Sequence, residues 1–328
     1  MKVRIAVGLS GAGRDGAGRD GAGRDGAGRD GAGRDGAGRD GAGRDGAGRD
    51  GGELSADEFA GLVADLAELR FDSLWVSEVL TGPGPDPLIA LATAAQLHPK
   101  LKLGTTMLLP GRNEVRLAKS LATLDVLSRG RLLLTFVPGL AHGPERDAVG
   151  VPVPWRGDAI ERTLPRLRRW WAGDEVDGIT VRPRPVQDPL EPWLGGLAPA
   201  SLDRCGRLAD GWLGAACTPR QAAAAREAIN EAARRAGRGI DPEHFGISIG
   251  YTHQPLDDRQ LAALAARTQG REVDPRALVP VGYGALRATL TSFIDAGMSK
   301  FVLRPMAVRG SWREELAGLA DAVLPLQT

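Results

Sequence analysis

The sequence has few of the residues on which several classes of protein depend. Only two of its 328 residues are cysteines, Cys205 and Cys217, which excludes a small fold held together by disulfides. Its 42 lysines and arginines nearly balance 41 aspartates and glutamates, for a formal net charge of +1. Proteins that bind nucleic acid or anionic membranes through a basic field carry a larger excess, so we expect neither partner.

Long apolar runs are also missing. No segment approaches the roughly 20 apolar residues of a membrane span, and residues 1–10 lack the apolar stretch of a signal peptide. Together with the scarcity of cysteine, these absences predict a soluble protein of the reducing cytoplasm.

Several motifs of catalytic sites are absent as well. The four histidines are scattered, and no two of them have the spacing of a metal-ligand pair. Residues 8–12 read GLSGA and miss the G-x-S-x-G pattern of a nucleophile elbow at its last position. No phosphate-binding loop of the G-x-x-x-x-G-K-[ST] type occurs. We therefore expect no metal site and no nucleophile elbow.

Residues 11–50 are eight copies of the pentapeptide Gly-Ala-Gly-Arg-Asp. No aliphatic side chain in them is larger than alanine, so burial cannot offset the entropy of ordering, and we expect a disordered insertion. We interpret it as an inert expansion rather than a lid, because nothing in it can dock. Its first six residues match the dinucleotide pattern G-x-G-x-x-G, but no helix can propagate through glycines that recur in every period. The match therefore comes from the array itself.

Outside the repeat, short aliphatic runs alternate with longer amphipathic runs. Capping patterns mark several helix starts, after Ser55, Asp86, Asn113, Thr218 and Ser311. Further helical segments are expected at 158–171, 199–208, 257–267 and 286–296. The strands are expected at 3–9, 72–79, 101–109, 131–137, 193–196, 211–216, 245–251 and 300–304.

This alternation predicts the fold class. Eight parallel strands with intervening helices, in the 288 of 328 residues that lie outside the 40-residue repeat, predict an α/β fold of the (β/α)8 TIM-barrel type. A doubly wound open sheet is the competing architecture, because periodicity does not show closure. Residues 172–190 are rich in proline and glycine and predict a short excursion after the fourth unit, with one hairpin. We expect one barrel domain over 1–328, with the repeat in the first loop.

A barrel of this kind places its functional groups where the strands end. The candidates at those positions are Ser77, Glu78, Thr105, Thr106, Met107, Gly139, His142, Gly195, Gly196, His253 and Arg304. Glu78 is interpreted as an acid or as a holder of a cofactor ring, although a carboxylate that caps a loop fits its position equally well. His142 is a second catalytic candidate, and an exposed loop histidine is the alternative reading.

The loop from Gly195 to Pro199 joins a strand end to a helix start. Small residues there leave backbone N–H groups and the positive end of the helix open, which suits a phosphate. A tight connection without any ligand explains the same residues.

Several segments in the same order resemble the luciferase-like monooxygenase superfamily. They are residues 71–77 (FDSLWVS), 86–92 (DPLIALA), 103–106 (LGTT), 117–125 (LAKSLATLD), 182–187 (RPRPVQ), 193–196 (WLGG) and 209–212 (ADGW). The resemblance covers the whole chain except the repeat. It is strongest to the actinobacterial branch of oxidoreductases that depend on the deazaflavin coenzyme F420.

The resemblance implies a homodimeric (β/α)8 barrel that binds a flavin or deazaflavin at the carboxyl ends of its strands. Gly195, Gly196, Ala198 and Pro199 correspond to the loop that receives the cofactor phosphate. Residues 106–107 fall where relatives have a non-proline cis peptide behind the cofactor ring. The other residues implied in cofactor binding are Ser77, Thr105 and Gly139.

Two departures from the family pattern affect the chemistry. Glu78-Val79 stands where many deazaflavin-dependent relatives have Asp-His, so a histidine acid at that place is excluded. The turn after the fourth strand retains a single glycine, Gly139. Three hypotheses follow: hydride transfer between F420 and a small organic substrate, an FMN-dependent monooxygenase with a separate reductase, or a barrel that binds the cofactor without catalysis.

Overall fold

The computed structural model describes residues 1–9, 13–14, 54–141, 143–268, 271 and 273–328. The predicted disorder of the repeat beyond Arg14 and the candidate His142 therefore lie outside the described residues.

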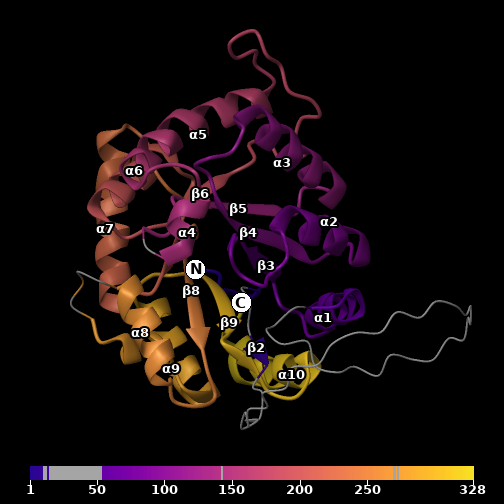
Figure 1. Cartoon of the computed structure of the whole chain (residues 1–328), viewed down its shortest axis with the longest axis vertical. Helices are drawn as coiled ribbons and strands as arrows, with labels where there is room; N and C mark the ends of the chain where they lie inside the picture. Colours follow the sequence, from indigo (N-terminus) through magenta and orange to yellow (C-terminus); the bar gives the residue numbers. More distant parts are fainter. Residues whose placement is uncertain (10–12, 15–53, 142, 269–270, 272) are drawn as a thin grey trace, which may run out of the picture.

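Parallel strands close into a barrel around which the helices form an outer ring (Figure 1). The barrel strands are β1 Arg4–Leu9, β3 Ser73–Ser77, β4 Lys102–Leu108, β5 Leu132–Val137, β6 Pro192–Leu194, β7 Gly211–Ala215, β8 Phe245–Tyr251 and β9 Lys300–Pro305. Closure is shown by β1, which pairs with β3 on one side and with β9 on the other, with Arg4 opposite Lys300. The predicted (β/α)8 barrel is confirmed, and the open sheet is excluded.

Five helices begin directly after the capping residues Ser55, Asp86, Asn113, Thr218 and Ser311. The helix expected from residue 286 begins four residues earlier, at Gly282. The structure describes ten α-helices. They are α1 Ala56–Glu68, α2 Pro87–Leu97, α3 Glu114–Ser128, α4 Gly143–Ala148, α5 Arg156–Ala172, α6 Pro199–Leu208, α7 Pro219–Arg235, α8 Asp258–Arg267, α9 Gly282–Asp295 and α10 Trp312–Val323. Ser55, Thr218 and Ser311 each accept a hydrogen bond from the backbone N–H of the residue three positions later. The side chain of that later residue in turn accepts a hydrogen bond from the backbone N–H of the capping residue. None of the helices in the part of the chain that the structure describes has the length and apolar content of a membrane span.

Three details differ from the expectations. The short helix α4 was not predicted, because its sequence GPERDA has no apolar periodicity. The hairpin expected in the excursion is reduced to one antiparallel bridge between Val176 and Ile179. Two short strands, β2 (Gly13–Arg14) and β10 (Ala307–Val308), form a parallel pair outside the barrel. The expectation that nothing in the repeat can dock is therefore wrong for its third and fourth residues, which bond through their backbone.

The core has two shells. Most buried aliphatic and aromatic residues lie between the strands and the helices, whereas a second cluster fills the barrel axis. The inner cluster consists of Ala6, Trp75, Leu213 and Val302, with Leu133 and Trp193 packed against it. A Cβ atom on Gly104 would lie 2.1 Å from Cε2 of Trp75, so the indole lies directly against the backbone of β4. Trp75 thus takes the space that a side chain on the next strand would need.

Both cysteines are buried in the described structure and unbonded to each other. Cys205 lies in α6 and donates to the carbonyl of Gly211, and Cys217 follows β7. Burial raises the pKa of each thiol to about 12. They act as small apolar residues of the core.

Charged side chains close the end of the barrel where the strands begin. The carboxylate of Asp72 accepts hydrogen bonds from Lys102 at 2.8 Å and Lys300 at 3.1 Å, and Arg4 lies 3.7 Å away. Burial alone would raise the pKa of Asp72, but the two ammonium groups outweigh it and lower the pKa to about 2. These contacts join the first residues of β1, β4 and β9.

We expect Gly104→Ala to destabilise the protein strongly, because the added methyl would overlap the buried indole of Trp75. Overpacking of this kind costs about 1–3 kcal/mol. The matched control is Gly61→Ala in α1, where a Cβ would meet no atom within 4 Å and helix propensity favours alanine. Urea unfolding of both variants measures the difference, and equal stabilities would contradict the packing described for Trp75.

The lowered pKa of Asp72 predicts a loss of stability in acid. A carboxylate whose pKa is lowered in the folded state stabilises the protein above its unfolded value of 3.8, and this contribution disappears as the pH falls toward 2. At 1.36 kcal/mol per pH unit the contribution is about 2 kcal/mol. The free energy of unfolding of Asp72→Asn should therefore depend less on pH over this window than that of the wild type. Asp321→Asn, at an exposed position of α10, should retain the wild-type slope.

Candidate functional site

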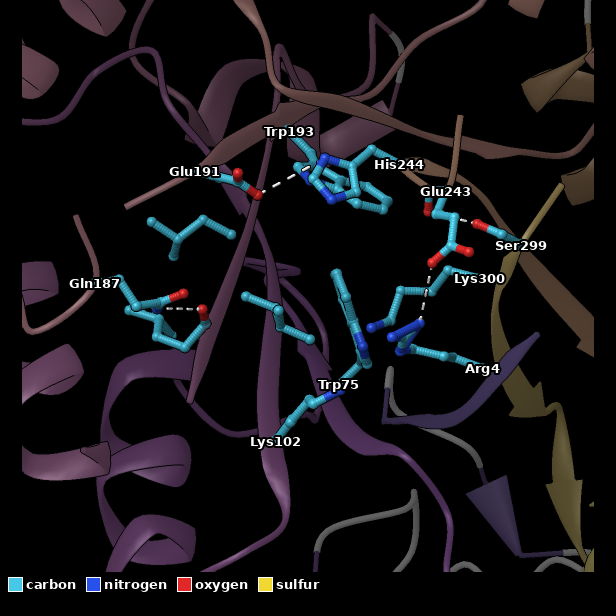
Figure 2. Close-up of a pocket in the computed structure, with 13 residues that line it drawn as sticks. Arg4, Trp75, Lys102, Gln187, Glu191, Trp193, Glu243, His244, Ser299 and Lys300 are labelled. Atoms are coloured by element: carbon cyan, nitrogen blue, oxygen red, sulfur yellow. Dashed lines mark hydrogen bonds and ion pairs between the residues drawn. The ribbon is translucent and has the colours of Figure 1, made fainter. Parts of the chain in front are cut away.

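The barrel has a pocket at each end. One, of about 230 Å³, lies where β7, β8 and β9 end, and Ala216, Ser248, Gly250, Arg304 and Met306 contribute to its wall. The other, of about 200 Å³, lies where the strands begin, and Figure 2 shows it. We call it the lower pocket; its wall includes Arg4, Trp75, Lys102, Glu191, Trp193 and Lys300. Loops after the strands carry the chemistry in barrels of this type, so the carboxyl end of the barrel is the candidate active site. The first pocket lies at the β7–β9 side of this end, where Leu264 of α8 and Phe293 of α9 also border it.

Three small residues and one arginine line the barrel just above the inner cluster. Successive side chains of a strand alternate between its two faces, so the residues two positions beyond Ala6, Trp75, Leu213 and Val302 also point inward. These residues are Gly8, Ser77, Ala215 and Arg304. A Cβ on Gly8 would lie 2.7 Å from Cγ of Arg304, so the arginine stem passes over the glycine. Ser77, Ala215 and Arg304 are partly exposed, which shows that this end of the barrel is open.

Three hydroxyl residues lie side by side on neighbouring strands. Ser77 of β3 is paired with Thr106 of β4, and Thr106 with Thr135 of β5. The structure thus brings together two predicted site residues and one that was not predicted. Thr135 is fully buried, and its Oγ1 has no hydrogen-bond partner among the described residues. An unpaired buried hydroxyl costs about 1–3 kcal/mol, so this position suits a polar atom of a ligand or a water molecule.

Thr105 and Met107 point away from this row. The hydroxyl of Thr105 donates to the carbonyl of Val76 at 2.9 Å, and Met107 is packed in the core between strands and helices. Only their backbone borders the barrel interior. The prediction of a cis peptide at 106–107 is wrong, because the cis bonds among the described residues are Arg182–Pro183 and Asp188–Pro189. Strand β4 pairs regularly with β5 as far as Leu108, without a bulge.

The predicted phosphate loop lies between β6 and α6. Gly196 has φ = +120°, and a Cβ there would lie 2.9 Å from Cβ of Ser201, so the turn requires glycine. The indole N–H of Trp212 donates to the Gly196 carbonyl at 2.9 Å and holds it toward β7. Ala198 precedes α6 and provides no capping side chain. The positive end of α6 is therefore not neutralised by its own N-cap residue.

Glu78, at the end of β3, is held by hydrogen bonds to Leu108 and Arg112, and we call these three residues the clamp. Its side chain is 7% exposed, one oxygen accepts the N–H of Leu108 at 2.7 Å, and the other bonds to the guanidinium of Arg112. Arg112 also donates to the Leu108 carbonyl at 2.9 Å. Burial raises the pKa of Glu78, although Arg112 and the Leu108 N–H act in the opposite direction. The clamp ties the end of β3 to the loop after β4.

The loop after β5, which contains Gly139, is fixed by two buried charges. The guanidinium of Arg156 donates to the carbonyls of Val151 at 2.9 Å and Leu140 at 2.8 Å. Gly139 has φ = +85°, and a Cβ there would lie 3.2 Å from Arg156. Glu145 of α4 accepts hydrogen bonds from the backbone N–H groups of residues 80 and 81. Neither Arg156 nor Glu145 was found by sequence reasoning, because only the folded chain shows that they are buried.

His253 is part of a buried cluster beside the barrel. Its side chain is 8% exposed, and Nε2 lies 2.9 Å from both carboxylate oxygens of Glu315 in α10. Tyr251 and Tyr283 donate to the same carboxylate at 2.7 and 3.0 Å. Burial, followed by the charge of Glu315, raises the pKa of both tyrosines well above the usual range. The cluster fixes the loop after β8 to α9 and α10, and the described residues contain no group of three side chains arranged to hold a metal ion.

Known proteins share this chain's sequence pattern. The sequence model of the family described as luciferase-like monooxygenase matches residues 40–312. An uncharacterized protein of Mycobacterium tuberculosis is 34% identical over 150 residues, which cover 41% of this chain and 50% of that protein.

Two functionally described relatives match at similar levels. A 5,10-methylenetetrahydromethanopterin reductase of Methanolobus tindarius is 27% identical over 194 residues, covering 56% of this chain and 58% of the reductase. The oxygenase component of a flavin-dependent trigonelline monooxygenase of Acinetobacter baylyi is 30% identical over 132 residues, or 36% of each chain. This chain thus spans about half the length of the curated relatives it matches.

Solved structures share the fold at lower identity. The coenzyme F420-dependent tetrahydromethanopterin reductase of Methanopyrus kandleri superposes with a TM-score of 0.70 at 17% identity, covering 84% of this chain and 97% of the reductase. A monooxygenase of Streptomyces bottropensis gives a TM-score of 0.67 at 22% identity, covering 82% and 93%. At such identities the likeness establishes the barrel alone.

We expect Arg112→Met to leave the buried Glu78 carboxylate without its cation, which costs about 3 kcal/mol. The pKa of Glu78 should rise further, and a raised pKa in the folded state means that stability falls as the pH rises. The free energy of unfolding of this variant should therefore lie further below that of the wild type near pH 8 than near pH 5. Urea unfolding at both pH values measures it.

The double variant Glu78→Gln/Arg112→Met should recover most of the loss, since it removes the charge as well as its partner. Arg116→Met, on the exposed surface of α3, is the matched control and should change little. A loss that stayed the same at both pH values, and in the double variant, would contradict the clamp.

Proposed function

Because this chain belongs to the luciferase-like monooxygenase family, we propose that it is an oxidoreductase that transfers a hydride between coenzyme F420 and a small organic substrate. The observation that carries the proposal is the open carboxyl end of the barrel, where the glycine turn at Gly196 and the uncapped start of α6 adjoin a lining of small residues. The match to the Methanolobus reductase covers 194 residues, against 132 for the flavin-dependent monooxygenase. We take the longer match as support for the deazaflavin, because coenzyme F420 is the cofactor named for the tetrahydromethanopterin reductase of Methanopyrus kandleri.

The residues at this end fit a cofactor with a phosphate and a flat ring. We assign the phosphate to the loop 195–199, which includes Gly195, Gly196, Ala198 and Pro199, with the N–H groups of Gly196 and Ala198 as its donors. The N–H of Gly195 already donates to the carbonyl of Phe136 at 2.9 Å, and Pro199 has no N–H. We assign the ring to the space above Ser77 and Thr106. The hydroxyl of Thr135, in the same row, is buried beneath this space and has no hydrogen-bond partner among the described residues. Ser77 and Ala215 have small side chains at this end of the barrel, whereas the stem of Arg304 occupies the space over Gly8.

When bound, the deazaflavin supplies the hydride donor or acceptor, and the protein supplies orientation and exclusion of water. Trp75 and its neighbours close the barrel beneath the ring, so solvent does not reach the site from below. Both oxygens of Glu78 are engaged, so we propose that it positions the loop after β4 through Arg112 rather than acting as an acid. His142 lies outside the described residues and remains a candidate catalytic residue. A homodimer, a small-molecule substrate and a cytoplasmic location also remain predictions.

An FMN-dependent monooxygenase is the second candidate. It is favoured by the 30% identity to the oxygenase component from Acinetobacter baylyi. A barrel that binds the cofactor without catalysis is the third, because Glu78-Val79 replaces the Asp-His of many deazaflavin-dependent relatives.

The first experiment is a fluorescence titration of the purified protein with F420 and FMN in parallel. We expect F420 to bind more tightly. Gly196→Ala should weaken F420 about tenfold or more, a loss of at least about 1.4 kcal/mol, because alanine does not tolerate φ = +120° and would displace Ser201. A truncated deazaflavin that lacks the phosphate-bearing side chain should bind this variant nearly as tightly as it binds the wild type. Gly239→Ala, where no atom lies within 4 Å, is the control.

Each outcome decides between the candidates. Preference for FMN would replace the proposal with the monooxygenase, and binding of neither cofactor would overturn both. If F420 binds but no substrate in a broad screen oxidises its reduced form or reduces its oxidised form, the non-catalytic barrel is supported.

A further inference from the structure

The lower pocket lies at the end of the barrel opposite the candidate active site. Its walls come from the first residues of the strands, such as Arg4 of β1, Lys102 of β4 and Lys300 of β9 (Figure 2). Trp75 and the rest of the inner cluster separate it from the carboxyl end of the barrel. Whatever it binds is therefore independent of the hydride-transfer proposal.

One side of the lower pocket carries cations with unused hydrogen-bond donors. Lys102 and Lys300 each donate to Asp72 and to no other group in the described part of the chain, although an ammonium has three N–H donors. Lys300 is 8% exposed, so its remaining donors can reach only the pocket or its wall. Arg4 lies 3.7 Å from the same carboxylate. Three cations thus face two carboxylates, Asp72 and Glu243, the second of which lies 3.8 Å from Arg4. One further negative group would balance the charge on this side of the pocket.

Indole rings form the apolar part of the wall. Trp75 belongs to the inner cluster and Trp193 packs against it, and both border the pocket together with Leu133. The ammonium of Lys300 lies 6.0 Å from the ring centroid of Trp75. A planar or short aliphatic body would pack against these rings while its charged end met the lysines.

Two carboxylates limit the charge of the ligand. Figure 2 shows Glu191 across the pocket from Lys102, and Glu243 near Arg4. Glu191 accepts no hydrogen bond within the described residues and lies 3.7 Å from Nδ1 of His244, whereas Glu243 lies 3.8 Å from Arg4. Like charges repel, so these groups disfavour a second or third negative charge on the ligand. A phosphate or a dicarboxylate fits the wall less well than a single carboxylate.

From these contacts we propose that the lower pocket is a binding site for a small monocarboxylate with an aromatic or short aliphatic body. The carboxylate bonds to Lys102 and Lys300, and the body lies against Trp75 and Trp193. The pocket volume of about 200 Å³ limits the ligand to a single ring or a short chain. The alternative is that the charges satisfy only one another and close the barrel without a ligand.

Isothermal titration calorimetry with benzoate tests the proposal on the full chain. We expect saturable binding of one benzoate per chain to the wild type. Lys102→Met and Lys300→Met should each weaken it about tenfold or more, the effect of losing one charge-assisted hydrogen bond. Lys100→Met removes the same charge from an exposed position that does not border the pocket, and should leave the affinity unchanged. Lys102 is 40% exposed, so its variant should fold even if the Lys300 variant does not.

Matched ligands separate the two halves of the proposal. Benzyl alcohol, which has the ring without the charge, and inorganic phosphate, which has the charge without the ring, should both bind at least about tenfold more weakly than benzoate. Phosphate that bound as tightly as benzoate would overturn the assignment of a monocarboxylate. Absence of benzoate binding, or binding that both lysine variants leave unchanged, would overturn the site itself.

Discussion

The packing of Trp75 inside the barrel is the contact on which the rest of the structure depends. Eight parallel strands close around an axis that side chains must fill, and here one indole occupies the space that a side chain at Gly104 would need. With Ala6, Leu213 and Val302 it forms a wall across the barrel. The two ends are therefore chemically separate. Ser77, Ala215 and the glycine turn at Gly196 lie at the end where the strands finish, together with Arg304. Lysines, an arginine and carboxylates line the end where the strands begin.

Most of the fold could be predicted because it is encoded locally. The capping boxes at Ser55, Thr218 and Ser311 place three helix starts, and the aliphatic runs place the strands within a residue or two of where they lie. The features that were missed depend on contacts between distant parts of the chain. Glu145 bonds to the backbone of Leu80, 65 residues earlier, and no pattern near Glu145 indicates this. Closure itself, through β1 and β9, is also a long-range contact.

In the candidate site, too, local sequence pattern predicts some of the residues, whereas contacts between distant strands decide the others. Ser77 and Thr106 were predicted from their positions at strand ends, and the strand register brings them together. Thr135 belongs to the same row, but it precedes the end of β5 and was overlooked. Thr105 and Met107 were included with Thr106 although neighbours in a strand face opposite sides, so alternation alone would have separated them. Strand pairing, which sequence periodicity does not show, decides which hydroxyls meet.

The burial of both cysteines has a practical consequence for spectroscopy. The chain contains no other cysteine, and the pKa of each thiol is raised to about 12, so neither forms an appreciable amount of thiolate near neutral pH. A cysteine introduced at an exposed position would react selectively with maleimide or a nitroxide reagent. Labels placed near each end of the barrel would then report events at the two pockets separately, on an otherwise unmodified protein.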